Sequence, residues 1–288
     1  MSAVPAPGSA PGPRPVLTLL YAPADRPDRA AKALASDADV AVLDLEDAVA
    51  PAHKDAARES LVPLLGAIDP AVRRVQVRVN GRGTPWHDAD VLAVAALPPD
   101  VGARVPKVED PDTVRALAAT LPGRALHLIV ESALGVERAF ELASASGQVA
   151  TLGLGEADLR ADLGVSDDAG LAWARSRVVV AARAAGLPAP TMSVHPHVRD
   201  VDGLVASCRA GRALGFLGRA AIHPAQLAPI RAAFRPTDAE VERAQEVLDR
   251  VAQAHSAGVG AFVLADGTFL DAAMVAQART VVALAHLP

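Results

Sequence analysis

The chain has 288 residues, of which 51% are hydrophobic and 21% are charged, and its formal net charge is −5. This length can bury a large core, either as one barrel-sized domain or as two smaller ones. The acidic balance provides no basic footprint for nucleic acid, and Cys208, the single cysteine, excludes an internal disulfide framework. No apolar run reaches the roughly 18 residues of a membrane helix, so we expect no membrane partner. Residues 1–15 hold five prolines and no signal-peptide pattern, so we expect a disordered tail and a cytoplasmic protein.

In chain order, short apolar runs typical of strands alternate with segments of helical pattern. Strands are predicted at residues 16–22, 40–45, 74–79, 104–108, 126–130, 149–154, 190–195 and 219–222. Helices are predicted at 27–35, 52–65, from 84, from 111, and at 133–145, 170–185 and 200–214. Eight βα units without a linker between them indicate an α/β fold, a (β/α)8 TIM barrel over residues 16–236. An open, doubly wound sheet is the alternative, because a sequence does not show whether a sheet closes.

Residues 237–288 follow the eighth unit and are not needed to close a barrel. A long amphipathic helix is predicted at 238–257, followed by an apolar run at 259–264, a tight turn at Asp266-Gly267 and a last helix at 271–284. An apolar tail added to a finished barrel must pack on something, and a neighbouring subunit is the natural surface. We therefore expect a C-terminal lid and oligomerisation extension.

The segment 126–164 is the most informative part of the chain. An apolar run stops at Glu131, a helical segment follows, and a second apolar run ends in a turn that carries Glu156 and Asp158. Strand, helix, strand is a βαβ unit with parallel strands, and polar groups past the carboxyl ends of parallel strands lie where α/β proteins keep their chemistry. Carboxylates that converge there suit Mg²⁺, which prefers oxygen ligands. The alternative is that these acids only cap the helices that follow them.

Other strands also end in polar residues, which a barrel would gather at one mouth. Arg78, in the alternating strand VQVRVN, is suited to bind an anionic oxygen through its planar fork, although an ion pair with Glu46 or Asp47 is the structural alternative. Lys107 fits a salt-bridge partner of these acids better than a Schiff-base lysine, because the acids would keep it charged. The further strand-end groups are Asp25, Arg26, Asp44, Asn80, Glu109, His195, His197 and His223.

Several motifs in one order connect these residues to a known family. They read YAPADRPDRAAKAL, VLDLEDAVAPAHK, VRVNGRGTPW, VPKVEDP, LIVESALG, GLGEADLRADLG, DVDGL, AIHPAQL and DGTFLD. The chain resembles citrate lyase β-subunit-like proteins of the HpcH/HpaI aldolase group, which includes malyl-CoA, citramalyl-CoA and other hydroxyacyl-CoA lyases. The resemblance spans about residues 17–283 and implies a (β/α)8 barrel that uses Mg²⁺ and assembles as a homotrimer or hexamer.

The resemblance also implies roles for single residues. Glu131 and Asp158 match the metal ligands, with Glu131 also at the substrate, and Arg78 matches the arginine that holds the substrate's oxygens. Asp271 matches an acid on the C-terminal lid that reaches a neighbouring subunit's active site. Positions that match contacts to the CoA ester or to the rest of the substrate are Tyr21, Arg26, Lys32, Ile222 and His223. Glu46, Asp47 and Lys107 are expected to support the residues that contact the ligands.

The expected function is Mg²⁺-dependent cleavage of a 3-hydroxyacyl-CoA, such as malyl-CoA or citramalyl-CoA, to acetyl-CoA or a homologue and a 2-oxo acid. Two alternatives are a citrate lyase β-subunit acting on a citryl thioester carried by an acyl-carrier partner, and a non-catalytic paralogue that binds CoA esters. Departures from the family pattern at Leu134, Met192 and Ala272 bear on substrate identity. The apolar Met192 in particular predicts a preference for a bulkier or less polar acyl portion.

Overall fold

The computed structural model of the chain describes residues 15–66, 73–256, 262–263 and 269–286. The chain forms two compact units, residues 1–231 and residues 232–288, and each is described by itself. The expected tail at 1–15 lies almost wholly outside the described residues, as does the turn at Asp266-Gly267. The expected domain boundary at 236/237 stays a prediction.

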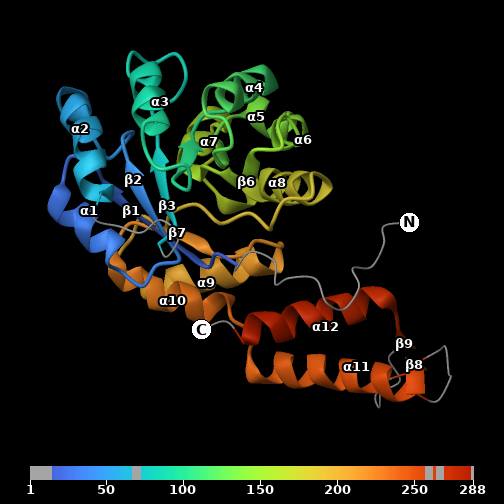
Figure 1. The fold of residues 1–288 in the computed structure, drawn as a ribbon. Helices are drawn as coiled ribbons and strands as arrows, with labels where there is room; N and C mark the ends of the chain where they lie inside the picture. The colour runs from blue at the N-terminus through green and yellow to red at the C-terminus, as the bar shows by residue number, and fades with distance from the viewer. Residues whose placement is uncertain (1–14, 67–72, 257–261, 264–268, 287–288) are drawn as a thin grey trace. The chain divides into compact units, whose positions relative to one another are not determined.

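A parallel sheet of seven strands forms the centre of the first unit (Figure 1), in the spatial order β6-β5-β4-β3-β2-β1-β7. Every neighbouring pair is parallel, so each strand is followed by a crossover that returns the chain to the same end of the sheet. The strands are β1 (Thr18–Pro23), β2 (Val40–Asp44), β3 (Val75–Arg78), β4 (Gly102–Val105), β5 (Leu126–Val130), β6 (Val149–Leu154) and β7 (Arg219–Ala221).

Helices follow the strands, as the alternating pattern predicts. Local signals fix where they begin: Pro27 and Pro111 occupy first helical positions, and the side chains of Asp110, Ser132 and Asp200 cap backbone N–H groups. The helices that begin in this unit are α1 (Pro27–Leu34), α2 (Lys54–Leu65), α3 (His87–Ala95), α4 (Pro111–Thr120), α5 (Ala133–Glu137), α6 (Ala139–Ala143), α7 (Glu156–Leu163), α8 (Ala172–Ala184), α9 (Val201–Ala213) and α10 (Leu227–Phe234).

The prediction of a full strand at 190–195 is wrong. This segment forms only one parallel bridge, between Met192 and Arg219, and its backbone hydrogen bonds go to β7 and to the residues just before it. The reason lies in the sequence, since Pro188, Pro190 and Pro196 lack the N–H that a ladder needs. The described fold is therefore an α/β half-barrel of seven parallel strands, of the TIM-barrel type. Closure by an eighth strand stays a prediction.

Both faces of the sheet are buried, which explains why its strands read as continuous apolar runs. The large core lies between the strands and the outer helices and is built from valine, leucine and alanine. On the inner face, Leu19, Val40 and Val42 form a small apolar cluster. The same face also carries polar side chains, because Gln76 and Arg78 alternate on β3 and register pairs Arg78 with Arg104 of β4 and Arg104 with His127 of β5. The inner face is therefore apolar on one side and polar on the other.

The second unit is a helical hairpin, in which α11 (Asp238–Ser256) and α12 (Ala272–Ala285) lie side by side (Figure 1). Its core contains Ala244, Val247, Val251 and Ala278. Two short antiparallel strands, β8 (Phe262–Val263) and β9 (Phe269–Leu270), stand between the helices in sequence. No described helix is both long and apolar enough to span a membrane.

Candidate active site

A pocket of about 350 Å³ opens at the carboxyl ends of the strands. The loops that follow the strands bring together residues that are distant in sequence, which is the usual position of a site in this architecture. Strand-end residues predicted from the sequence contribute much of the wall. The lining includes Tyr21, Asp44, Asp47, Arg78, Arg104, Glu131, Gly155, Asp158, Met192, Ser193 and Ile222.

Glu131 and Asp158 both line this pocket, Glu131 directly after the end of β5 and Asp158 in the first turn of α7. Glu131 is only 6% exposed, and its Oε2 accepts a hydrogen bond of 2.9 Å from the backbone N–H of Lys107. Burial, followed by the charges of Glu46 and Asp158, raises the pKa of Glu131 to about 8. The nearby cations Arg78 and Lys107 lower this pKa but do not offset the effect of burial.

This donor set fits a magnesium ion. Glu131 and Asp158 offer carboxylate oxygens in a pocket, and Mg²⁺ is commonly bound through one or two carboxylates together with waters and substrate oxygens. Among the described residues, no group of three or more His, Cys, Asp or Glu side chains forms a complete metal cage. The residues therefore suit an open Mg²⁺ site better than a closed structural one.

Gly155 is the reason that the Glu131 side chain can lie where it does. A Cβ at position 155 would overlap the Glu131 carboxyl group, only 2.7 Å from its Cδ. The backbone of Gly155 has φ −96° and ψ 92°, so the glycine is not needed for its conformational freedom. Its function is the close approach of a side chain to the backbone.

Arg78 is tied into a network of three acids. Its Nε and Nη2 donate to the two carboxylate oxygens of Asp44 at 2.7 and 2.6 Å. Its Nη1 lies 2.9 Å from Glu46 Oε2 and 3.0 Å from Asp47 Oδ2. Burial alone would lower the pKa of Arg78, but the hydrogen bonds and charge of Asp44 outweigh it and raise the pKa. Arg78 is therefore a fixed cation that also lines the pocket.

Lys107 lies beside the same acids. Its Nζ is 2.8 Å from Glu46 Oε1 and 3.8 Å from both Asp47 and Asp158. Burial would lower the pKa of Lys107, but the hydrogen bond to Glu46 and the surrounding acids raise it. A Schiff base requires a neutral amine, which this environment disfavours.

A second pocket of about 400 Å³ adjoins the first and shares Tyr21 and Ile222 with it. Its lining also includes Lys32, which the resemblance places at the CoA ester, His223, which it places at a further substrate contact, and Arg29, which the sequence did not single out. Arg26, the remaining residue of that set, precedes α1 and lies 3.6 Å from Asp28 without lining either pocket. This second pocket therefore has a cationic side formed by α1.

Four other predicted strand-end or lid residues have contacts of their own. Glu156 turns away from the pocket to a buried pair with Arg175, at 2.8 and 2.7 Å, so it holds α7 in place. Asp271 lies in the second unit and caps α12, accepting a hydrogen bond of 2.8 Å from the backbone N–H of Met274. His195 and His197 meet edge to face, with ring centroids 5.9 Å apart.

Met192 contributes to the pocket wall, but its sulfur points elsewhere. The sulfur lies 3.7 Å from Arg219 Nη1, and a Cβ at Gly211 of α9 would overlap it. The side chain therefore packs towards α9. This position argues against the direct substrate contact on which the predicted preference for an apolar acyl portion depends.

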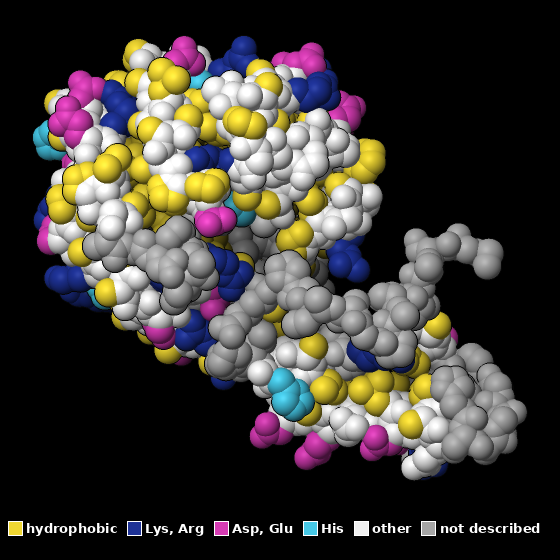
Figure 2. Space-filling view, in the orientation of Figure 1, with side chains coloured by type: hydrophobic (Ala, Val, Ile, Leu, Met, Phe, Trp, Pro, Cys, Tyr) yellow, Lys and Arg dark blue, Asp and Glu magenta, His cyan; other side chains and the backbone are white. Residues whose placement is uncertain are grey.

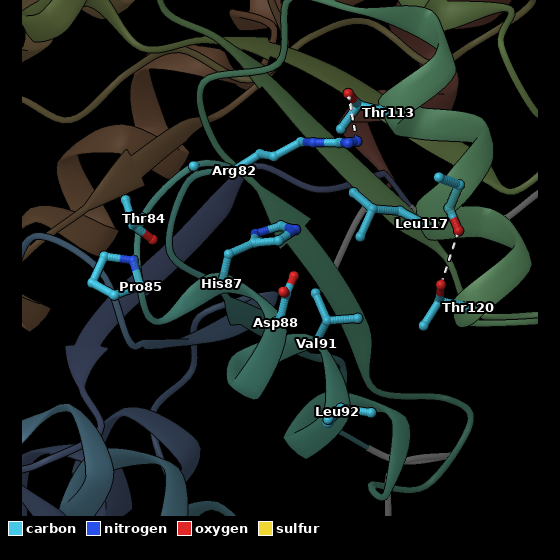
Figure 3. Close-up of a pocket in the computed structure, with 12 residues that line it drawn as sticks. Arg82, Thr84, Pro85, His87, Asp88, Val91, Leu92, Thr113, Leu117 and Thr120 are labelled. Atoms are coloured by element: carbon cyan, nitrogen blue, oxygen red, sulfur yellow. Dashed lines mark hydrogen bonds between the residues drawn. The ribbon is translucent and has the colours of Figure 1, made fainter.

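A larger groove, of about 740 Å³, lies between α3 and α4 (Figure 3). Arg82 and Thr113 form a hydrogen bond across it at 3.0 Å, and His87 points into it. It contains none of the acids or cations described above. Size alone therefore does not mark the functional site of this chain.

Two carboxylates, a guanidinium held by acids and an adjoining cationic pocket at the mouth of a half-barrel suit a metal ion and an anionic substrate. The chain matches the HpcH/HpaI aldolase/citrate lyase family over residues 17–224 and belongs to that family.

Similar proteins carry related names. Citrate lyase subunit beta of Leuconostoc mesenteroides subsp. cremoris is 31% identical, covering 93% of each chain. A (3S)-malyl-CoA thioesterase of Cereibacter sphaeroides is 35% identical, covering 94% of this chain and 95% of that one. Among solved structures, CitE of Mycobacterium tuberculosis in complex with magnesium, acetoacetate and coenzyme A has a TM-score of 0.80 and 35% identity, covering 94% of this chain and 98% of that one.

Proposed function

We propose that this protein is a Mg²⁺-dependent carbon–carbon lyase that cleaves a 3-hydroxyacyl-CoA such as malyl-CoA or citramalyl-CoA. The products are acetyl-CoA, or a homologue, and a 2-oxo acid. The observation that carries the proposal is the meeting of Glu131, Asp158 and Arg78 in one pocket that adjoins a second, cationic one. Relatives that include L-malyl-CoA/beta-methylmalyl-CoA lyase of Cereibacter sphaeroides, 32% identical over 95% of this chain, support the same reaction class.

In the cleavage direction, the hydroxyl group loses its proton and becomes the carbonyl of the 2-oxo acid. The bond between the hydroxyl-bearing carbon and the thioester's α-carbon breaks, and its electron pair leaves as the enolate of the thioester. A proton added to that α-carbon completes acetyl-CoA. Mg²⁺, when bound, supplies Lewis-acid polarisation of the oxo acid's oxygens.

The chain's own residues have distinct tasks in this scheme. Glu131 and Asp158 hold the metal, with Glu131 also against the substrate. Arg78 stabilises the oxygen that carries negative charge, and its bonds to Asp44 keep it in place without reorganisation during the reaction. Asp271 exchanges the proton at the α-carbon.

The CoA portion extends into the second pocket, past Tyr21 and Ile222. Lys32 and His223 line this pocket and Arg26 flanks it at the start of α1, so its cations suit the phosphates of CoA. Arg29 lines the same pocket and is a further cation for the CoA phosphates.

The larger assembly extends the proposal. The half-barrel closes as a (β/α)8 barrel, and the protein forms a homotrimer or hexamer in the cytoplasm. Its C-terminal unit is a lid that carries Asp271 to a neighbouring subunit's pocket and excludes water from the enolate. Asp271 caps α12 in the described chain, so its carboxylate serves both the helix and the reaction.

A second candidate is a citrate lyase β-subunit that acts on a citryl thioester held by an acyl-carrier partner. The relative from Leuconostoc favours it, because the similarity covers 93% of both chains. Co-purification of an acyl-carrier protein from the native source, together with activity only on the carrier-bound thioester, would select this candidate.

The metal ligands give the direct test. Glu131→Gln and Asp158→Asn should each abolish cleavage and weaken Mg²⁺ binding measured by calorimetry, because an amide lacks the anionic charge that Mg²⁺ requires. Asp112→Asn, on an exposed face of α4, is the control and should behave as the wild type. Activity that survives both substitutions and EDTA would contradict the metal site. Borohydride trapping at Lys107 would then be the next experiment.

A further inference from the structure

Arg104 on β4 lines the same pocket as Arg78 but differs from it in electrostatic environment. Register places Arg104 beside Arg78 of β3 and His127 of β5, so the three side chains share the inner face. Arg104 is only 6% exposed. Its described hydrogen bond runs from Nε to Gln76 Oε1 at 2.8 Å, and no carboxylate pairs with it in the part of the chain that the structure describes.

Two further neighbours of Arg104, His127 and Tyr21, provide no negative charge. His127 lies with its Nδ1 3.0 Å from Thr151 Oγ1, and burial, together with the charge of Arg104, lowers the pKa of His127 to about 3. The ring of Tyr21 lies 5.9 Å from Arg104 Cζ, and burial raises the pKa of its hydroxyl. A buried cation is costly unless an anion pairs with it. The two terminal nitrogens of Arg104 therefore have donors to offer to a ligand in the pocket.

The position of Arg104 also sets the kind of ligand. His127 lies level with Arg104 on β5, and Glu131 follows it four residues later, beyond the end of that strand. Arg104 therefore approaches the pocket from a deeper level than the metal-binding acids. An acid held by its first carboxylate at the mouth would direct its other end towards Arg104.

We propose that Arg104 binds a second carboxylate of the substrate, so that within the class of 3-hydroxyacyl-CoA esters the chain prefers one whose oxo-acid half is a 2-oxo dicarboxylate over malyl-CoA and citramalyl-CoA, whose oxo acids, glyoxylate and pyruvate, are monocarboxylates. The pocket, about 350 Å³ in volume, accommodates an acid of a few carbons. The reaction assigned to this substrate rests on the proposed lyase function, whereas the binding of an anion by Arg104 does not. The two are therefore tested by separate measurements.

The anion site is tested by binding. Calorimetry with 2-oxoglutarate and pyruvate as probes is carried out on the full chain, with and without Mg²⁺. We expect the wild type to prefer 2-oxoglutarate, and Arg104→Met to weaken its binding by roughly 30-fold, the value of one charged hydrogen bond, with a much smaller loss for pyruvate. Arg104→Lys keeps the charge but not the fork, and should recover part of the preference.

Arg82→Met is the matched control, because this exposed arginine lies in the groove between α3 and α4 and outside the pocket (Figure 3). It should leave both affinities unchanged. Equal losses for both probes in Arg104→Met, or no loss for either, would overturn the inference. If Arg104→Met does not fold, Arg104→Lys decides by the same ratio of affinities.

Activity then separates the two proposals. In the condensation direction, with acetyl-CoA, the ratio of kcat/KM for the dicarboxylate over the monocarboxylate should fall by roughly 30-fold in Arg104→Met. If no oxo acid condenses in the wild type, the lyase function fails while the calorimetry still decides the anion site. If the wild type both binds and condenses monocarboxylates better than dicarboxylates, the lyase function is supported and the proposed role of Arg104 is wrong.

Discussion

Replacement of Gly155 by alanine should disable the metal site without touching a ligand. The new Cβ would lie 2.7 Å from Glu131 Cδ, where carbon atoms ordinarily stay about 3.5–4.0 Å apart. The Glu131 carboxyl group must therefore retreat by about 1 Å. Mg²⁺ holds its ligands at about 2.0–2.1 Å in near-octahedral geometry, so a shift of this size removes the contact.

The expected effect of Gly155→Ala is a loss of Mg²⁺ affinity of about 10- to 100-fold, and a stability cost of about 1–3 kcal/mol from overpacking. Titration with Mn²⁺ followed by electron paramagnetic resonance measures the first quantity, and denaturant unfolding measures the second. Gly153→Ala, two residues earlier and within β6, is the control, since its Cβ would lie 3.7 Å from the nearest atom, Leu128 O. A folded Gly155→Ala protein that binds metal as the wild type does would refute this reasoning.

Three further predictions concern Arg78, Asp271 and His127. Arg78→Lys should lower kcat by about two orders of magnitude, because lysine keeps the charge but loses the planar fork that binds both oxygens of the Asp44 carboxylate. Wild-type kinetics in this variant would show that Arg78 only neutralises the neighbouring acids. Asp271→Asn keeps a side chain that can cap α12 but removes the acid, so this variant and Arg78→Ala should each be inactive alone. Co-refolded mixtures of the two variants should regain activity, and no recovery despite subunit exchange would exclude a lid that acts on a neighbouring subunit. The pKa of His127 is about 3 in the fold against 6.5 ordinarily, so the unfolded chain binds the proton more readily and stability is lost as the pH falls below about 6.5. The wild type should lose roughly 3 kcal/mol more than His127→Gln between pH 7 and pH 4 in denaturant titrations, and equal losses would contradict this.

The alternation of apolar runs and helical segments predicted seven of the strands in their places, because parallel strands buried on both faces read as continuous apolar runs. The segment 190–195 failed for a local reason. Its apolar residues resemble a strand, but the prolines around it remove the hydrogen-bond donors that a strand would use.

The candidate site was predictable where position along a strand decides it. Glu131 and Arg78 follow directly from the end of β5 and the alternation in β3. Glu156 was grouped with Asp158, although residues two apart on a helix do not share a face, and Glu156 turns to Arg175 instead.

Arg104 was missed because its importance depends on its partners. The strand GARV carried a signal, since its charged residue alternates with apolar neighbours as Arg78 does in VQVRVN. Only the fold shows that Arg78 is paired with acids, while the described hydrogen bond of Arg104 goes to the neutral Gln76. A sequence alone does not distinguish an arginine that is paired with acids from one that has no acidic partner.

The products released from a 3-hydroxyacyl-CoA by the wild-type protein test the central claim most directly. The substrate panel includes malyl-CoA, citramalyl-CoA and a thioester that would release a 2-oxo dicarboxylate, each with Mg²⁺ and with EDTA. Chromatography of the CoA species and hydrazone trapping of the oxo acid identify the products. A lyase yields acetyl-CoA, or a homologue, and a 2-oxo acid in equal amounts, only with Mg²⁺. Free CoA with an intact hydroxy acid would instead show thioester hydrolysis and contradict the account.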